Sequence, residues 1–146
     1  MKIIAENKRA RFDYELIDAY EAGIVLTGDE IKSVRLGHFS IVDCYGFIKD
    51  GECFLRNSYI KEYSNSFDAG RFGDTTRRDR KLLLHKEEIL KIKKKLETEH
   101  LTLVPTKSYF DGSNLKVEIA VARGKKLYDK RESLKKKDIE KKLRNL

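Results

Sequence analysis

The clearest pattern of apolar and polar positions lies near the C-terminal end of the chain. Apolar residues occupy alternate positions, with charged residues between the first three: Leu115, Val117, Ile119 and Val121 against Lys116 and Glu118. Alternation with a period of two indicates a strand with one buried and one solvated face. The apolar run Leu101–Phe110 precedes it across the turn sequence Asp111–Asn114. We therefore predict a β-hairpin over these two segments.

A second hairpin is predicted over Tyr45–Arg56. Asp50-Gly51 is a strong two-residue turn signal, because both central positions of the favoured turn need a positive φ angle. Counting outward from this turn pairs Lys49 with Glu52, Ile48 with Cys53, and Phe47 with Phe54. Opposite charges beside the turn and an aromatic cross-strand pair support that register.

The remaining segments predict further strands and two helices. Residues Tyr14–Leu26 suit a long strand bent near Gly23, and Lys81–His85 suits a short one. Thr27 and Glu30 have the spacing of a capping box, so a short helix should follow and end at Gly37. A second helix is expected over His85–His100, with Ile89, Ile92 and Leu96 on one face.

Two segments show no sustained period. Asn7–Tyr14 is a basic stretch with two aromatic residues, interpreted either as a solvated arm or as an RNA contact. Ser64–Asp79 should be a long loop. Its aromatic and basic residues could form a stacking and phosphate-binding surface, or the loop could be mobile with its aromatics folded onto the core. These residues are Phe67, Arg71, Phe72, Arg77, Arg78 and the adjoining Arg80.

This order of elements predicts a mainly β fold: a small antiparallel barrel of the oligonucleotide-binding (OB) type, with two or three helices and a basic C-terminal tail. Closure of a barrel would remove the exposed strand edges. With 146 residues, the chain can bury one substantial core. We expect one domain over residues 1–128 and a tail over residues 129–146. The tail should be disordered when free, because its lysines repel one another and few apolar residues offset the cost of ordering.

Charge is distributed very unevenly. Residues 1–80 carry 13 basic and 14 acidic side chains, whereas residues 81–146 carry 19 and 10, for a net charge of +8 overall. A polyanion is therefore the expected partner of the C-terminal part, and nucleic acid is the commonest one. A membrane surface is the alternative, but the tail lacks the Trp and Phe anchors that a membrane-surface helix uses.

The sequence argues against an enzyme, a metal site and a cofactor. Cys44 and Cys53 have no ligand spacing and are predicted to be reduced core residues. His38, His85 and His100 are widely separated, and no glycine loop of the phosphate-binding kind is present. The N-terminal residues lack the apolar core of a secretory signal, which favours a cytoplasmic location.

Six motifs in order give the chain a specific resemblance. They are Asn7-Lys-Arg-Ala-Arg11, Tyr20-Glu-Ala-Gly23, Glu30-Ile-Lys-Ser33, Arg80-Lys-Leu-Leu-Leu-His85, Leu101-Thr-Leu-Val-Pro105 and Ala122-Arg-Gly-Lys-Lys-Leu-Tyr-Asp-Lys-Arg131. Over nearly its whole length, the chain resembles the small protein B family, the SsrA-binding proteins of bacterial trans-translation. It departs from the family pattern at Thr75, where many relatives have Pro, and at Phe12, where some have His.

The resemblance implies a non-enzymatic protein that binds the tRNA-like domain of transfer-messenger RNA (SsrA RNA), assists its alanylation and accompanies it to stalled ribosomes. Its partners would be that RNA and the ribosome, at the decoding centre and messenger channel. Elongation factor Tu and alanyl-tRNA synthetase would be indirect partners through the RNA, and neither DNA nor a membrane is expected. The resemblance also implies that the tail becomes helical on the ribosome and senses the empty messenger channel.

The resemblance also implies two groups of site residues. The RNA-binding face would comprise Asn7, Lys8, Arg9, Arg11, Glu21, Leu83, Lys125 and Lys126. The ribosome-contacting tail would comprise Tyr128, Asp129, Lys130, Arg131, Lys135, Lys136 and Lys137.

Glu21 is the most informative residue of the predicted RNA-binding face. An acid on a face that binds a polyanion weakens binding unless it accepts hydrogen bonds from bases or riboses. The alternative role for Glu21 is a salt bridge to a neighbouring Arg. The alternative for the whole chain is a general single-strand-binding or ribosomal-type protein, and an RNA-processing enzyme is a further possibility.

Overall fold

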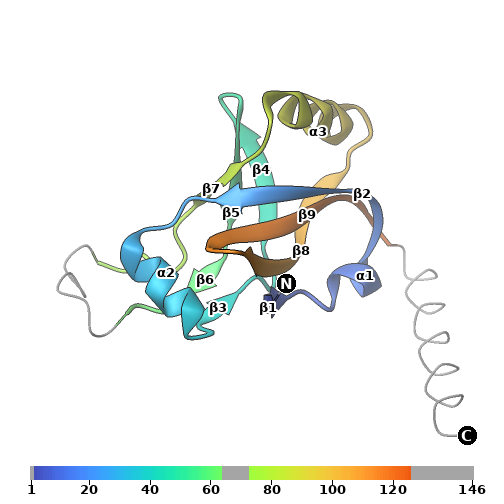
Figure 1. Ribbon diagram of the computed structural model, residues 1–146. Coiled ribbons are helices and arrows are strands. Elements are labelled where there is room, and N and C mark those ends of the chain that lie inside the picture. Colours follow the sequence, from blue (N-terminus) through green and yellow to red (C-terminus); the bar gives the residue numbers. More distant parts are fainter. Residues whose placement is uncertain (1, 64–72, 126–146) are drawn as a thin grey trace, which may run out of the picture.

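The computed structural model describes residues 2–63 and 73–125 (Figure 1). Its elements, in chain order, are β1 (Lys2–Glu6), α1 (Ala10–Asp13), β2 (Tyr14–Ile24), α2 (Gly28–Arg35), β3 (Phe39–Ser40), β4 (Tyr45–Lys49), β5 (Glu52–Arg56), β6 (Tyr59–Ile60), β7 (Arg80–Leu83), α3 (Lys86–Thr98), β8 (Thr102–Asp111) and β9 (Asn114–Gly124). The predicted mainly β, antiparallel fold with a few helices is confirmed.

Seven strands form one antiparallel sheet in the order β1-β8-β4-β5-β7-β2-β9, and β9 pairs with β8 as well. Starting from β8, the pairings therefore run through β4, β5, β7, β2 and β9 and return to β8. In the described part of the chain, β1 is the one strand of this sheet that lies outside the ring, paired only with β8. The closing contact between β4 and β8 is a single residue pair, Gly46 with Leu103.

Gly46 makes the β4–β8 contact possible. A Cβ atom at this position would lie 2.5 Å from Cδ2 and 2.8 Å from Cγ of Leu103. Both distances are shorter than van der Waals contact, so the two strands approach only because Gly46 lacks a side chain.

Both predicted hairpins are confirmed. In β4–β5, Phe47 pairs with Phe54, and their rings stack with centroids 5.4 Å apart. Lys49 pairs with Glu52 as expected, although Glu52 forms its ion pair with Lys81 of β7, at 3.0 Å. The β8–β9 hairpin places Val117, Ile119 and Val121 in the core, and Leu115 is buried as well.

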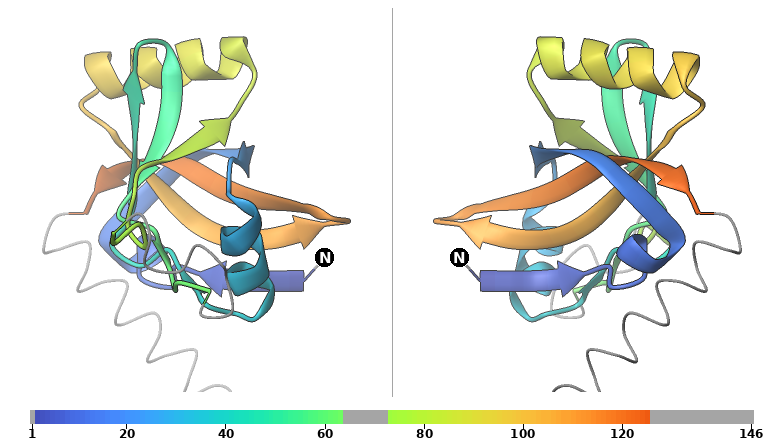
Figure 2. Two further views of the ribbon diagram at one scale, coloured as in Figure 1. Left: turned by 90° about the vertical axis from the view of Figure 1, so that its left-hand side faces the viewer. Right: turned by 90° about the vertical axis from the view of Figure 1, so that its right-hand side faces the viewer.

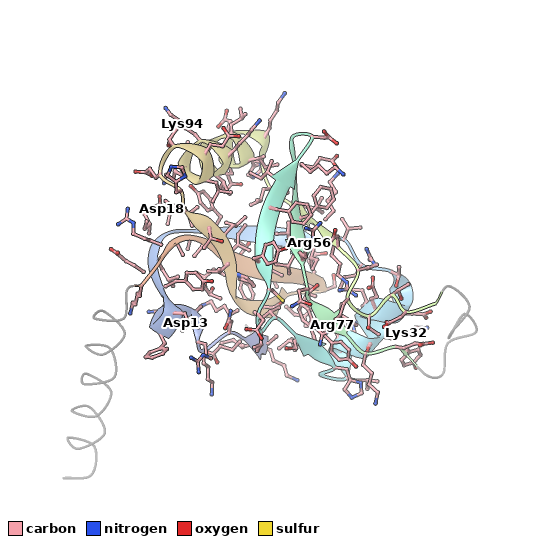
Figure 3. The ribbon with its side chains drawn as sticks, turned by 180° about the vertical axis from the view of Figure 1, so that it is seen from behind. Asp13, Asp18, Lys32, Arg56, Arg77 and Lys94 are labelled. Carbon is pink, nitrogen blue, oxygen red and sulfur yellow. The ribbon has the colours of Figure 1, made fainter. Side chains whose placement is uncertain are left out.

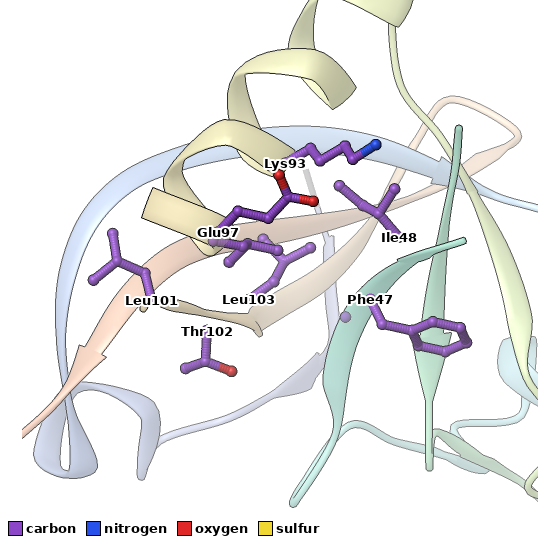
Figure 4. A pocket seen from close by; sticks show the side chains of 9 residues that line it. Phe47, Ile48, Lys93, Glu97, Leu101, Thr102 and Leu103 are labelled. Carbon is purple, nitrogen blue, oxygen red and sulfur yellow. The ribbon is translucent and has the colours of Figure 1, made fainter. Parts of the chain in front are cut away.

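The core lies inside the ring of strands and extends under the helices. It contains residues from every part of the described chain, including Ile41, Leu55, Leu82, Ile92 and Leu103. Side views show α3 lying across one end of the strands, with β1 at the other (Figure 2). Between α3 and the strands β4 and β8, a hollow of about 230 Å³ remains, with Ile48, Leu101 and Leu103 in its wall and Lys93 and Glu97 at the helix (Figure 4).

Three local predictions were wrong or incomplete. The irregularity in β2 lies at Ile17, where the pairing with β9 shifts between Leu16 and Asp18, and not at Gly23, which keeps its register with both neighbours. The basic stretch after β1 is not a plain solvated arm, because it contains the short helix α1 and its Ala10 is buried. The sequence signals also missed β1 and the small sheet formed by β3 and β6.

The predicted capping box of α2 is confirmed. Thr27 Oγ1 accepts a hydrogen bond from the Glu30 amide at 3.2 Å, and Glu30 Oε1 accepts one from the Thr27 amide at 2.9 Å. Gly37 follows the last turn with a φ angle of +86°, which glycine adopts without steric cost. The helix therefore begins and ends where its local sequence predicts.

Candidate functional site: the outward face of β2, β8 and β9

One end of the site is the junction between α1 and the end of β9. The Asn7 amide donates to the Thr106 carbonyl at 2.8 Å, and Asn7 Nδ2 donates to the Pro105 carbonyl at 3.1 Å. Lys125 closes the junction from the other side, because its Nζ donates to the Arg11 carbonyl at 2.9 Å. Asn7, Arg11 and Lys125, three predicted RNA-binding residues far apart in sequence, are thus brought together.

Lys8 and Arg9 lie on the exposed side of the same junction. The Arg9 guanidinium lies 5.3 Å from the centroid of the Phe12 ring, and its Nε is 3.5 Å from Asp13 Oδ2. An arginine held over an aromatic ring in this way keeps a defined orientation while its edge stays in solvent. Phe12, where some relatives have His, supports Arg9 through its ring face.

The centre of the site is Glu21 on β2. It is exposed, it faces Glu118 across the β2–β9 ladder, and its Oε2 accepts a hydrogen bond from the hydroxyl of Tyr109. Burial and this hydrogen bond raise the pKa of Tyr109 to about 12, so the hydroxyl stays a donor at neutral pH. The partner of Glu21 among the described residues is therefore a tyrosine, not the arginine that the alternative interpretation required.

Leu83 marks the other end of the site. Half of its surface is exposed, and its side chain lies against Gly23, with which it pairs on the neighbouring strand. Because side chains on a strand alternate, Ala19, Glu21 and Gly23 all point outward while Ala22 and Ile24 point into the core. Leu83 therefore lies two residues from Glu21 along β2, whereas Asn7 is bonded to β8 on the other side of β9.

Seven further residues share this face with Glu21 but were not predicted as site residues. Lys116 pairs with Gly23 and Tyr109, and Glu118 pairs with Glu21 and Lys107. The alternation along β9 predicts that Lys116 and Glu118 are solvated, but only the register shows that they flank Glu21. We name the set of Ala19, Glu21, Gly23, Lys107, Tyr109, Lys116, Glu118 and Ala120 the outward strip.

The outward strip contains a hollow with a clear structural cause. The pairing of β9 shifts at Ile17 on β2 and again at Thr106 on β8, so the strands on both sides of β9 carry a bulge near the same place. A bulge bends its strand and leaves one residue out of the ladder. The result is a hollow of about 200 Å³, which we name the bulge hollow; its lining includes Arg11, Ile17, Asp18, Ala19, Thr106 and Glu118.

A second group of charged side chains, on another side of the protein, forms hydrogen bonds among its own members. Glu30 Oε2 accepts from Arg80 Nη2 at 2.6 Å, and Glu30 Oε1 accepts from Arg78 Nη2 at 2.5 Å. Arg80 is completely buried and also donates to the carbonyls of Ser58, Thr75 and Thr76. We name Glu30, Arg78 and Arg80 the Glu30 clamp, which joins α2, β7 and the segment before β7.

The Glu30 clamp favours the charged form of its carboxylate. Burial alone would raise the pKa of Glu30, but the hydrogen bonds from Arg78, from the Thr27 amide and from Arg80 together lower it. Burial lowers the pKa of Arg80, while the Glu30 carboxylate opposes that shift. Because an arginine side chain is charged at any physiological pH, Glu30 determines how the clamp responds to pH.

These contacts correct the predicted phosphate-binding surface of the long loop. Arg80 is unavailable to a ligand because it is buried, and Arg78 is committed to Glu30. Arg77 remains exposed, over the ring of Tyr59 at 5.0 Å. Phe67, Arg71 and Phe72 lie outside the described residues.

Arg77 lies near Arg56, at a distance from the bulge hollow. Arg56 lies 4.2 Å from the Phe47 ring centroid and forms a two-contact ion pair with Asp79, at 3.1 and 3.0 Å. Seen from behind, Arg56 and Arg77 are well separated from Asp13 and from Asp18 of the hollow (Figure 3). Arg56 and Arg77 therefore form a second basic group, which lies apart from the predicted RNA-binding residues.

The two cysteines are buried and free, as predicted. Burial raises the pKa of Cys44 to about 12 and that of Cys53 to about 11, so both remain neutral thiols. Across residues 2–63 and 73–125, no cluster of three His, Cys, Asp or Glu side chains has the arrangement of a metal site. Within the same residues, no helix has the length and apolar character needed to cross a bilayer.

The predicted ribosome-contacting tail lies outside the described residues. This applies to Tyr128, Asp129, Lys130, Arg131 and Lys135–Lys137, and also to Lys126 of the predicted RNA-binding face.

The fold and the site define a small, mainly antiparallel β protein whose candidate site is an open, mixed-charge surface. The chain belongs to the SmpB family: the family model described as "SmpB protein" matches residues 4–146.

Relatives named SsrA-binding protein match almost the whole chain. The one from Sulfurihydrogenibium sp. is 48% identical over 97% of this chain and 91% of its own length. The one from Acidothermus cellulolyticus is 53% identical over 91% of this chain and 82% of its own, and the one from Carboxydothermus hydrogenoformans is 47% identical over 98% and 97%.

The fold also matches a solved structure. A chain from work described as "tmRNA-SmpB: a journey to the center of the bacterial ribosome" superposes with a TM-score of 0.68 and 44% sequence identity. The match covers 88% of this chain and 92% of that one.

Proposed function

We propose that this protein binds the tRNA-like domain of transfer-messenger RNA and delivers that RNA to stalled ribosomes for trans-translation. The observation that carries the proposal is the near full-length similarity to SsrA-binding proteins, including a chain whose solved structure is described as tmRNA-SmpB. Direct partners are transfer-messenger RNA and the ribosome, and the protein acts in the cytoplasm.

The architecture supports an OB-type barrel over residues 1–128. The ring of pairings from β8 through β9 leaves β2 and β9 side by side, with Ala19 and Glu21 exposed and Lys116 and Glu118 half-buried beside them. RNA is recognised mainly through shape, 2′-hydroxyls and unpaired bases, which needs hydrogen-bond donors and acceptors as well as positive charge. The outward strip offers both, with Glu21 as an acceptor and Asn7, Arg11 and Lys125 grouped at one end.

The finer steps of the function depend on parts that remain proposals. Binding of the tRNA-like domain would assist its charging by alanyl-tRNA synthetase, and the charged RNA would then travel with elongation factor Tu. Residues 129–146 would enter the empty messenger channel near the decoding centre and become helical there. The high density of lysine in this segment suits ribosomal RNA as its partner.

Selectivity at moderate salt tests the proposed function. The protein should bind transfer-messenger RNA more tightly than unrelated transfer RNA or single-stranded RNA. A higher salt concentration should reduce this difference in affinity only slightly. Bulk electrostatic binding weakens steeply with salt, whereas contacts to shape and bases persist. Equal affinity for all three RNAs would instead favour a general single-strand-binding protein, and specific cleavage of labelled RNA would reveal an enzyme.

Truncation tests the division between barrel and tail. A protein lacking Lys130–Leu146 should bind transfer-messenger RNA nearly as well as the full chain but fail to support tagging on stalled ribosomes. Tagging by the truncated protein would contradict the proposed role of the tail.

A further inference from the structure

We propose that the bulge hollow binds a single unpaired nucleobase, and that guanine fits it best. This inference rests on the proposed RNA-binding function and adds to it a specific subsite. The hollow lies between α1 and the strands β2, β8 and β9, where the bulges at Ile17 and Thr106 face the same part of β9.

The size of the bulge hollow suits one base. An apolar cavity of about 150 Å³ is large enough to bind benzene. The bulge hollow measures about 200 Å³ and is open to solvent on one side, so a planar ring can enter with its sugar left outside. Ala19 and Ala120, which pair across β2 and β9, keep this space free because their side chains are small. Ile17, 39% exposed, adds an apolar wall.

The charges of the bulge hollow favour a base over a phosphate. Two carboxylates, Asp18 and Glu118, lie in its lining and would repel a phosphate group. One oxygen of each is already used: Asp18 Oδ2 accepts from Lys95, and Glu118 Oε2 accepts from Thr106 Oγ1 at 2.7 Å. The other oxygen of each carboxylate has no hydrogen-bond partner among residues 2–63 and 73–125.

Open carboxylate oxygens select a ligand that carries N–H donors. Asp and Glu side chains accept hydrogen bonds from the amino groups of bases, and unpaired RNA bases offer these on their Watson–Crick edge. Guanine presents N1–H and N2–H side by side, so both can reach the lining carboxylates, and its O6 can accept from a donor such as Arg11. Uracil presents one N–H between two carbonyls and is the poorest match.

The surroundings of the bulge hollow supply the complementary phosphate contacts. Lys125 Nζ is bonded to the carbonyl of Arg11, which places an amine beside a residue that lines the hollow. Lys8 and Arg9 are exposed on the adjoining turn before α1. A nucleotide bound here would have its base among acceptors and its phosphate near basic side chains.

Titration with free nucleotides tests the subsite without any assumption about transfer-messenger RNA. We expect GMP at millimolar concentration to shift the NMR amide signals of Ile17, Asp18 and Ala19 in a saturable way, with AMP and CMP weaker and UMP weakest. Glu118→Gln should reduce the preference for GMP over UMP, because an amide group replaces one acceptor with a donor. The absence of saturable shifts for all four nucleotides would overturn the proposal, as would equal binding of all four.

Filling the bulge hollow tests its contribution to RNA binding. Ala19→Leu should weaken binding of the tRNA-like domain about tenfold, whereas Val42→Leu, which adds bulk at an exposed residue outside the hollow, should bind as wild type. Unfolding curves of both variants would show that the fold is intact. Wild-type affinity in Ala19→Leu would overturn the subsite. The proposed function fails separately, if wild-type protein binds unrelated transfer RNA as tightly as transfer-messenger RNA.

Discussion

The Glu30 clamp and the outward strip are built from similar side chains. They differ in how far the carboxylates are buried and bonded to arginines. In the clamp, both carboxylate oxygens of Glu30 are bonded to arginines, and Arg80 has no exposed surface. In the outward strip, Glu21 is exposed and pairs with a second acid across the ladder. Charge content alone therefore does not distinguish the Glu30 clamp from the outward strip, whereas the hydrogen bonds of their carboxylates do.

The comparison predicts the largest effect for removal of Arg80. Arg80→Ala should lower the free energy of unfolding by about 3–5 kcal/mol, because it leaves the largely buried Glu30 without one partner and removes the guanidinium donor to the Ser58, Thr75 and Thr76 carbonyls. Chemical denaturation followed by circular dichroism measures this loss.

Arg56→Ala is the matched control for Arg80→Ala. Arg56 also forms a two-contact ion pair, but its side chain is 47% exposed and that of Asp79 is 42% exposed. An exposed pair of this kind contributes little to stability, because water and salt screen its charges. Equal losses in the two variants would show that the Glu30 clamp has no special role in stability.

The close contact of β4 with β8 is the next most sensitive position. Gly46→Ala should destabilise the protein by about 1–3 kcal/mol, because the added methyl group would overlap Leu103 across the pairing that completes the ring. Gly28→Ala is its control, since nothing lies within 4 Å of the added atom and alanine favours the α2 helix. Equal melting temperatures for Gly46→Ala and Gly28→Ala would contradict the structural need for Gly46.

Acid should weaken the Glu30 clamp only below the ordinary pKa of a glutamate. The pKa of Glu30 is lower in the folded protein than its ordinary value of 4.5, so its contribution to stability is complete above that value. The contribution is lost as the pH falls below 4.5 and through the folded pKa. Unfolding free energies measured between pH 6 and about pH 2 should fall less steeply in Glu30→Gln than in wild type. Parallel curves of unfolding free energy against pH for the two proteins would contradict the role of Glu30 in the response to acid.

The sequence predicted much of the fold because its signals are local. The Asp50-Gly51 turn and the Thr27–Glu30 capping box each depend on a few neighbouring residues, and both formed as expected. The bulge at Ile17 could not be predicted in this way. It arises from the pairing of β2 with β9, whose residues lie about a hundred positions further along the chain, and no residue preference marks it.

The same limit applies to the candidate site. The family motifs marked Asn7, Glu21 and Lys125, but the partner of Glu21 is Tyr109, which the sequence analysis did not single out. Arg80 shows the opposite limit, because its position beside a polar loop allows a phosphate contact as one of two alternatives, and the residue is in fact buried. Which charges are neutralised inside the fold depends on tertiary contacts, and composition does not show them.

Glu21→Gln is expected to have the smallest effect, but the direction of its effect on RNA affinity distinguishes two hypotheses. If the outward strip attracted RNA by charge alone, removal of an acid would strengthen binding. If Glu21 accepts hydrogen bonds from RNA, the variant should bind the tRNA-like domain about tenfold more weakly, which corresponds to about 1.4 kcal/mol, with unfolding free energy nearly unchanged. Filter binding at two salt concentrations measures both the affinity and the salt slope.

Glu52→Gln completes the test of Glu21. Glu52 is also exposed on a strand, but it pairs with Lys81 on the β4–β5 hairpin, outside the outward strip. Its removal should leave RNA binding unchanged or slightly tighter, as expected for a distant acid. Because both variants lose one carboxylate, a difference between their RNA affinities reports the position of the acid and not its charge. Tighter binding in both would mean that the outward strip, like an ordinary basic surface, binds RNA by net charge.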